Sequence, residues 1–217
     1  KSRAITGGGF VNFQWVDPQL EKRYGDNKSY DAGLPIHFDV LPHVLSIIEM
    51  MLPDKVWKLD SVIPRYGGSK LCIKMYLDTI PLNVLLQRNG KERSRLLSVE
   101  HEGSSELNFS KEPGRIHHNG KKIGVDKNWE SPLNKMINSF FESILKKKCH
   151  KILDPRIDLK IAKTTDNIHQ LYRKELLAWL SQESAFKKSK DLSYKYSLRE
   201  VLSWGQNLSK EDLEVEV

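Results

Sequence analysis

Residues Gly33–Pro53 read GLPIHFDVLPHVLSIIEMMLP, and the prediction of the fold starts from them. Their apolar residues recur three and four positions apart, as on the buried face of a helix: Val44, Leu45, Ile47, Ile48, Met51 and Leu52. Pro53 closes the pattern because proline cannot continue the helical hydrogen-bond ladder. The stretch therefore predicts that extended chain turns into a helix near Asp39 and that this helix ends at Pro53.

Asp39 and His43 stand four positions apart in this stretch, so on a helix they lie on the same face. A carboxylate in such a pair can hold a substrate hydroxyl while the imidazole, which titrates near neutral pH, removes or returns its proton. A purely structural interpretation also fits, in which Asp39 caps the helix and His43 is an ordinary histidine of its first turn. The spacing alone leaves both open.

Length and composition indicate a soluble globular protein. The 217 residues are enough for one large domain or two small ones, and 39% of them are apolar. No apolar run approaches the ~20 residues that a membrane helix needs. Cys72 and Cys149 lie far apart, without disulfide or metal spacing, which suits a reducing compartment. We therefore expect a cytoplasmic protein with no membrane partner and no metal.

The net charge of +7 comes from 35 basic and 28 acidic residues spread along the chain. The densest basic block, Lys146–Lys148, falls at the end of a predicted helix, where cations complement the helix dipole. No nucleic-acid-binding motif accompanies it, so we expect no nucleic-acid partner. A basic nucleic-acid-binding domain remains the least favoured alternative, since it rests on charge alone.

Strand patterns dominate the region on either side of the Asp39–His43 helix. Residues 7–16 predict a strand with Val11, Phe13 and Trp15 alternating, and Leu71–Leu77 alternate equally clearly. Asn-Gly pairs at Asn89-Gly90 and Asn119-Gly120 are typical of hairpin turns, which favours an antiparallel meander with one covered face. The three glycines Gly7–Gly9 precede a strand, so they do not form a dinucleotide fingerprint, which follows a strand and opens a helix.

Residues 17–32 are polar and predict a long loop over the site. Because long loops in compact domains are often functional, Lys22, Arg23 and Tyr24 are candidate substrate-binding residues. His117 and His118 are neighbours on a predicted strand and point to opposite faces, so they are interpreted as surface residues rather than a metal pair.

Two further helices are predicted towards the C-terminal end. Ser131 and Pro132 are good first positions for a helix that runs to about Lys148 and whose apolar stripe predicts core packing. A second helix is predicted from about Asp158 to Leu180. Residues 181–217 differ in composition and predict a C-terminal extension with a short amphipathic helix around Trp204.

The stretch around Asp39 and His43 resembles the signature that opens the C-terminal domain of the Gfo/Idh/MocA oxidoreductases: a glycine, an apolar strand end, D-x-G-x-H, and an apolar helix closing at Gly or Pro. Gly33, Asp39, His43 and Pro53 occupy the matching positions. The motif differs at Leu41, which replaces its glycine, and at Ser46, which replaces an acidic residue. Weaker likenesses, at Glu102-Gly103 with Leu107 and at residues 131–144, extend the resemblance over residues 7–180.

The resemblance implies an α/β (α+β) fold: an open, mostly antiparallel sheet with helices packed on one face and the other face used for homo-oligomerisation. Residues 1–180 would form this domain, with no Rossmann half in the chain. The cofactor, NAD or NADP, would be bound mainly by an N-terminal domain that is not present. The predicted 158–180 helix would return near the active site, which makes Thr165 and His169 further substrate-binding candidates, with a solvated polar helix face as the alternative.

By the same resemblance, the chain would be the substrate-binding and oligomerisation part of a nicotinamide-dependent oxidoreductase that acts on a sugar, cyclitol or related hydroxyl or carbonyl compound. His43 would be the general acid/base, and Asp39 would orient the substrate and the imidazole. The chain alone would be inactive, because hydride chemistry belongs to the cofactor. The alternative is a non-catalytic binding or scaffold module that retains the fold, which Leu41 and Ser46 favour.

Overall fold

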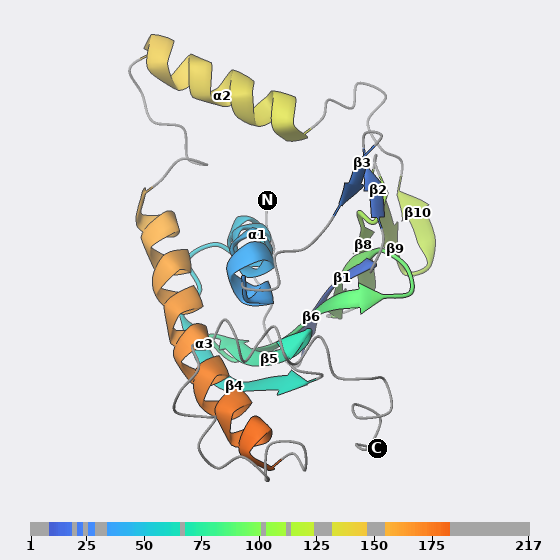
Figure 1. Cartoon of the computed structure of the whole chain (residues 1–217). Helices are drawn as coiled ribbons and strands as arrows, with labels where there is room; N and C mark the ends of the chain where they lie inside the picture. The colour runs from blue at the N-terminus through green and yellow to red at the C-terminus, as the bar shows by residue number, and fades with distance from the viewer. Residues whose placement is uncertain are drawn as a thin grey trace.

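The described residues form one open sheet of eight strands, a separate two-stranded hairpin and three helices (Figure 1). The computed structural model describes residues 9–18, 21–23, 26–28, 34–65, 68–100, 103–111, 114–123, 132–146 and 155–182. The sheet has the order β10-β9-β8-β7-β1-β6-β5-β4. Its strands are β1 (Phe10–Pro18), β4 (Trp57–Arg65), β5 (Lys70–Leu77), β6 (Ile80–Gly90), β7 (Ser94–Glu100), β8 (Ser104–Asn108), β9 (Arg115–His118) and β10 (Lys121–Ile123). The predicted α+β class with a mostly antiparallel sheet is confirmed.

β1 lies in the centre of the sheet, parallel to β6 on one side and antiparallel to β7 on the other. Its alternate residues Val11 and Phe13 are each only 1% exposed, because they face the helix-covered side of the sheet and belong to the core. All other neighbouring strands of this sheet are antiparallel. The sheet is therefore mixed, and the predicted meander is interrupted by the N-terminal strand.

The predicted hairpin at Asn89-Gly90 is wrong, because β1 separates β6 from β7. β6 continues to Gly90, which pairs with Pro18 at the end of β1. A Cβ atom at position 90 would collide with Cγ1 of Val16, so glycine is needed here for the close approach of two strands rather than for a turn. The second Asn-Gly prediction is confirmed: Asn119 and Gly120 have φ angles of 49° and 74° and join β9 to β10.

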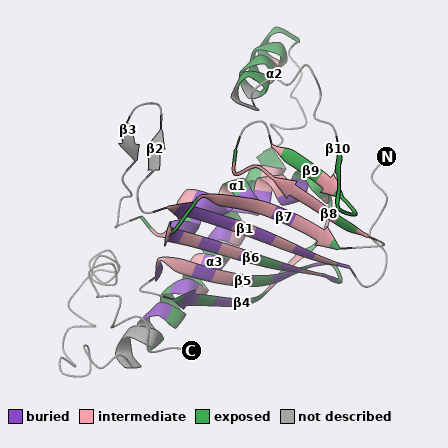
Figure 2. Cartoon of the chain, turned by 90° about the vertical axis from the view of Figure 1, so that its right-hand side faces the viewer, coloured by how far each residue is buried: buried purple, intermediate pink, exposed green. Residues whose placement is uncertain are grey.

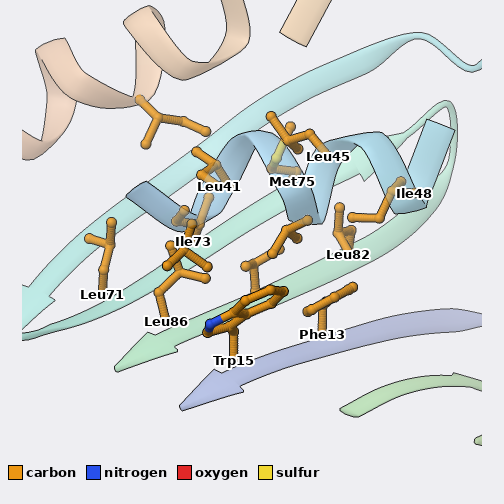
Figure 3. Packing of buried hydrophobic residues seen from close by; sticks show 14 of the residues in the cluster. Phe13, Trp15, Leu41, Leu45, Ile48, Leu71, Ile73, Met75, Leu82 and Leu86 are labelled. Atoms are coloured by element: carbon orange, nitrogen blue, oxygen red, sulfur yellow. The ribbon is translucent and has the colours of Figure 1, made fainter. Parts of the chain in front are cut away.

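Helix α1 (Ile36–Met51) lies across the middle of the sheet and supplies much of the core (Figure 3). Its Leu41 and Leu45 pack over the strands, against side chains that include Ile73, Leu82 and Leu86. Helix α3 (Pro155–Gln182) packs on the same side, against α1 and β4. The predicted arrangement, with helices on one face of the sheet, holds for α1 and α3.

α1 begins earlier than the apolar pattern predicts and contains a proline. Pro35 is the N-cap, so Asp39 lies in the first turn and does not cap the helix. Pro42 lies inside the helix, and the carbonyl of Pro42 accepts a hydrogen bond from the Ser46 hydroxyl at 2.7 Å. The helix ends at Met51, two residues before Pro53, as predicted.

Helix α2 (Pro132–Lys146) forms where the sequence predicts it but does not use its apolar stripe for core packing. Ile137, Phe140, Phe141 and Ile144 are between 42% and 57% exposed. Figure 2 shows the described part of α2 as largely exposed and standing away from the sheet. The core interpretation of this stripe is therefore wrong for the described residues, because amphipathic periodicity specifies a helix but not what covers it.

The predicted long loop over residues 17–32 contains a small hairpin, made of β2 (Glu21–Arg23) and β3 (Asp26–Lys28). On the helix-free face of the main sheet, the central strands form a shallow hollow of about 520 Å³. Half of the residues that line this hollow are polar: Asn12, Gln14, Lys70, Lys74, Asn83 and Ser98. The hollow therefore combines polar side chains with apolar ones such as Leu85 and Leu96.

The packing of α1 on the sheet predicts a sharp contrast between two positions of the same helix. Leu45 is wholly buried, so Leu45→Ala should lower the free energy of unfolding by about 2–5 kcal/mol through lost burial and a residual cavity. Met50 is 68% exposed, and Met50→Ala should change it by no more than about 0.5 kcal/mol. Urea unfolding of both variants measures the difference, and equal losses would contradict the placement of α1.

Candidate functional site

Asp39 and His43 lie on one flank of α1, outside the apolar stripe that faces the sheet. Val40 and Val44, which follow them in the sequence, are buried, whereas His43 is exposed and the Asp39 side chain is 39% exposed. The four-residue spacing therefore places a carboxylate and an imidazole side by side at a surface, as the sequence predicts.

Arg88 joins the start of α1 to the end of β6. The side chain is only 4% exposed; its Nη1 donates to the carbonyl of Leu34 at 2.7 Å, and its Nη2 lies 3.2 Å from Oδ2 of Asp39. A buried guanidinium is stable only with such partners, because an unpaired charge would lose its hydration without compensation. Arg88 thus holds the Asp39 carboxylate and the entry to the helix in one arrangement.

Sequence reasoning missed Arg88 because the residue was assigned to a hairpin turn. The signal was present in the alternation of β6, where Leu82, Val84 and Leu86 face the helices. Arg88 is the next residue in this series, so a strand that continues to Gly90 places its side chain on the same face.

His43 lies over Trp15, a residue of the central strand. The two rings are nearly parallel, at 14°, with centroids 6.2 Å apart. The Trp15 indole N–H donates to Oδ2 of Asp17 at 3.0 Å, and the Arg95 guanidinium lies 3.8 Å from the centroid of the indole. The carboxyl end of β1 thereby brings an aromatic ring and a second Arg–Asp pair to the candidate site.

A separate polar cluster lies between α1 and α3. Nε2 of the fully buried His37 is 3.0 Å from Nδ1 of His169, and the His37 ring packs on Tyr172 with centroids 4.6 Å apart. Within the described part of the chain, His37 Nδ1, the Tyr172 hydroxyl and the Thr165 hydroxyl are buried without a hydrogen-bond partner. The cluster is therefore an element of helix packing that contains several unsatisfied polar atoms.

Burial dominates the ionisation of this cluster. Burial lowers the pKa of His37 to about 3, and its electrostatic interactions with His169 and with the Arg88 guanidinium act in the same direction. Burial also lowers the pKa of His169 and raises that of Tyr172. All three groups are consequently neutral near pH 7, which is the form that a buried interface tolerates.

The structure separates the predicted substrate-binding residues. Thr165 is buried and does not lie on a solvated helix face, whereas His169 is half-buried and contacts His37 and Phe38 rather than Asp39 or His43. Lys22 and Arg23 lie in β2. Tyr24 is outside the described residues, as is the predicted extension from residue 183 onwards.

The described residues offer no sign of a metal centre or a dinucleotide site. No group of three or more His, Cys, Asp or Glu side chains in these ranges is placed to hold a metal ion. α1 begins at Ile36 without a side-chain cap, and no glycine-rich turn between a strand and a helix is present in the described ranges. These described residues therefore do not fit a dinucleotide. No described helix is long and apolar enough to cross a membrane.

Chemically, the arrangement supplies one exposed imidazole, one partly exposed carboxylate and two arginines that are each bonded to an aspartate. An imidazole and a carboxylate on one helix flank can transfer a proton to or from an oxygen and orient the hydroxyl that bears it. The roles predicted for Asp39 and His43 from their spacing stay predictions.

Solved structures of dehydrogenases share the fold. UDP-N-acetylglucosamine 3-dehydrogenase GnnA from Acidithiobacillus ferrooxidans matches 77% of this chain with TM-scores of 0.61 and 0.58 in two crystal forms, at 13% and 14% identity. The dehydrogenase MviM from Clostridium difficile matches 74% of it with a TM-score of 0.55 at 10% identity. The chain spans about half of their lengths, 54% and 53% respectively. Neither protein-family models nor curated protein sequences give a match.

The comparison confirms the fold that the resemblance implies. The matched proteins are dehydrogenases by name, and this chain corresponds to about half of each of them. At these identities the comparison establishes the architecture only.

The buried histidine pair predicts a loss of stability in acid. Between the ordinary pKa of 6.5 and about 3, the unfolded chain binds a proton at position 37 that the folded chain does not, so the free energy of unfolding should fall as pH falls through this window, by up to about 1.4 kcal/mol per pH unit. His37→Leu should flatten this dependence. The exposed His118→Gln should not, and identical pH profiles for wild type and His37→Leu would contradict the assignment.

Proposed function

We propose that the chain is the substrate-binding and oligomerisation part of a nicotinamide-dependent oxidoreductase. The observation that carries the proposal is the position of Asp39 and His43. Both lie on one flank of α1, outside the apolar stripe that faces the sheet, in a fold that dehydrogenases share. The proposed substrate is a sugar, cyclitol or related compound whose hydroxyl or carbonyl group reacts.

In this proposal His43 is the general acid/base at the reacting oxygen. In the oxidative direction, a nitrogen of its imidazole takes the hydroxyl proton as the carbonyl forms, and in the reductive direction it returns the proton. The nicotinamide cofactor, NAD or NADP, would accept or supply the hydride and would be held by a domain outside this chain. The chain by itself would bind substrate without turning it over.

Asp39 orients the substrate hydroxyl, and Arg88 holds the Asp39 carboxylate in place. The contact between Arg88 and Asp39 leaves the carboxylate partly exposed, so it can still accept a hydrogen bond from a ligand. Both site arginines are bonded to aspartates, Arg88 to Asp39 and Arg95 to Asp17. This pairing supports a reacting group that is uncharged, such as an alcohol or a ketone, rather than a phosphate or a carboxylate.

A second candidate function is a non-catalytic binding or scaffold module with the same fold. The two departures from the family signature favour it, and the structure shows what they do. Leu41 is wholly buried in the core, and the Ser46 hydroxyl donates to the backbone of its own helix. Position 46 thus holds a short side chain bonded to the helix in place of a carboxylate near the site.

Homo-oligomerisation through the helix-free face is part of the proposal. In the centre of that face, Leu85 and Leu96 lie in a hollow among polar side chains. An interface here would combine a small apolar centre with hydrogen-bonding groups, as many interfaces between protein subunits do.

The catalytic role of His43 is tested in the longest polypeptide that the native coding sequence produces. If its intact mass exceeds 25.1 kDa by the size of a nucleotide-binding half, oxidation of NADH and NADPH is followed with a panel of keto-sugars and keto-cyclitols. His43→Ala should then lower kcat by about 10²–10⁴-fold, the usual contribution of a general acid or base. The surface variant His118→Ala should leave kcat unchanged. Undiminished turnover by His43→Ala would refute the proposed role and favour the scaffold module.

The oligomer is tested by sedimentation equilibrium of the chain. Leu85→Arg places a charge in the centre of the helix-free face and should dissociate the assembly to a monomer, because a buried unpaired charge opposes association. Leu159→Arg, at an exposed position on α3, should not change the mass. A monomeric wild-type chain, or an oligomer that Leu85→Arg leaves intact, would remove this part of the proposal.

A further inference from the structure

We propose that Trp15 is a positioning residue that fixes the plane of the His43 imidazole, and that Asp17 and Arg95 hold Trp15 in place for this task. The inference rests on the proposed function in one respect: its consequence for turnover requires that His43 transfers a proton. The geometric part concerns contacts in this chain alone.

An exposed histidine on a helix flank normally exchanges between side-chain rotamers. His43 instead lies on the face of Trp15, with the rings at 14° and their centroids 6.2 Å apart. An offset, nearly parallel arrangement is one of the favourable geometries for aromatic rings. The contact thus selects one orientation of an imidazole that solvent would otherwise leave free to turn.

Trp15 itself is held on two sides. Its indole N–H donates to Oδ2 of Asp17, and Nη2 of Arg95 donates to Oδ1 of the same carboxylate at 2.9 Å. The guanidinium of Arg95 also stacks on the indole, since Trp15 and Arg95 are paired across β1 and β7. The Phe109 ring meets the indole edge-on at 6.3 Å. The indole therefore has a fixed position and a fixed tilt.

Burying the Asp17–Arg95 ion pair beside Trp15 carries an unfavourable desolvation free energy. The side chains of Asp17 and Arg95 are only 3% and 11% exposed, and the desolvation of such a pair offsets much or all of its attraction. An apolar pair would cover the indole equally well. The ion pair adds a defined geometry, because each carboxylate oxygen of Asp17 holds one hydrogen-bond partner at a defined angle.

Trp57 shows the contrast within the same chain. It also lies under a cation, Lys160, at 4.1 Å, but Lys160 bonds to Glu49 and to the carbonyl of Lys55. The buried indole nitrogen of Trp57 makes no hydrogen bond to any described residue. Trp57 is a packing residue between α3 and β4, and it provides a matched control for Trp15.

Fixing the imidazole matters because proton transfer requires a donor–acceptor distance of about 2.6–3.2 Å, and a displacement of about 1 Å can cost about 100-fold in rate. A rotating His43 would meet this geometry only part of the time. Trp15 would consequently affect kcat, through the orientation of His43, more than KM.

The stack is tested by NMR on the whole 217-residue chain with its seven histidines isotopically labelled. A ring above an indole is shielded, so the His43 imidazole protons should resonate upfield of those of exposed His118. Trp15→Leu should abolish this shift, Trp15→Phe should retain part of it, and Trp57→Leu should leave it unchanged. Arg95→Lys keeps the charge but loses the planar stack, and it should reduce the shift.

Unshifted His43 protons in the wild-type chain, or a shift that survives in folded Trp15→Leu, would overturn the proposal. If the Trp15→Leu chain does not fold, the proposal is overturned when the His43 protons of both Trp15→Phe and Arg95→Lys resonate where they do in the wild-type chain. In an active longer enzyme, Trp15→Phe should lower kcat by roughly 10- to 100-fold with KM unchanged. The two proposals can also fail separately. If the His43 protons are shifted upfield but His43→Ala leaves turnover unchanged, the stack on Trp15 is retained and the proposed function is rejected.

Discussion

The pairing of β1 with β6 and β7 is the constraint on which the rest of the structure depends. Because β1 runs parallel to β6, the carboxyl ends of both strands lie at the same edge of the sheet. Because β1 is antiparallel to β7, that edge also receives the start of β7 and with it Arg95. The side chains around Asp39 and His43 are assembled at this edge.

Electrostatics at this edge follow from burial. Arg88 and Arg95 are largely removed from water, and each is compensated by an aspartate: Asp39 from α1 and Asp17 from β1. The two pairs differ in exposure, since Asp17 is buried with its arginine whereas Asp39 remains partly open to solvent. One pair is therefore part of the interior, and the other leaves a carboxylate partly open to solvent.

Local patterns in the sequence predict most of the elements but few of the contacts between them. The stripe of α1, the alternation of β5 and the turn at Asn119-Gly120 depend on neighbouring residues and are recovered. The contact between Arg95 and Asp17 spans 78 positions, and that between Arg88 and Asp39 spans 49. No periodicity encodes such distances, and the sequence analysis therefore misses both arginines and the role of Trp15. The prediction that the apolar stripe of α2 packs in the core is wrong for a related reason, because periodicity does not identify the surface that covers a helix.

α1 faces three different surroundings, and the helical repeat places the residues that face each of them on separate sides of the helix. Leu41, Leu45 and Ile48 face the sheet, and His37 turns towards α3. Asp39 and His43 occupy the remaining flank, near the end of β1. Because residues four positions apart share a face, a substitution on one flank leaves the others in place. His43, which is exposed, can therefore vary in sequence without disturbing the core, whereas Asp39 is tied to the buried guanidinium of Arg88.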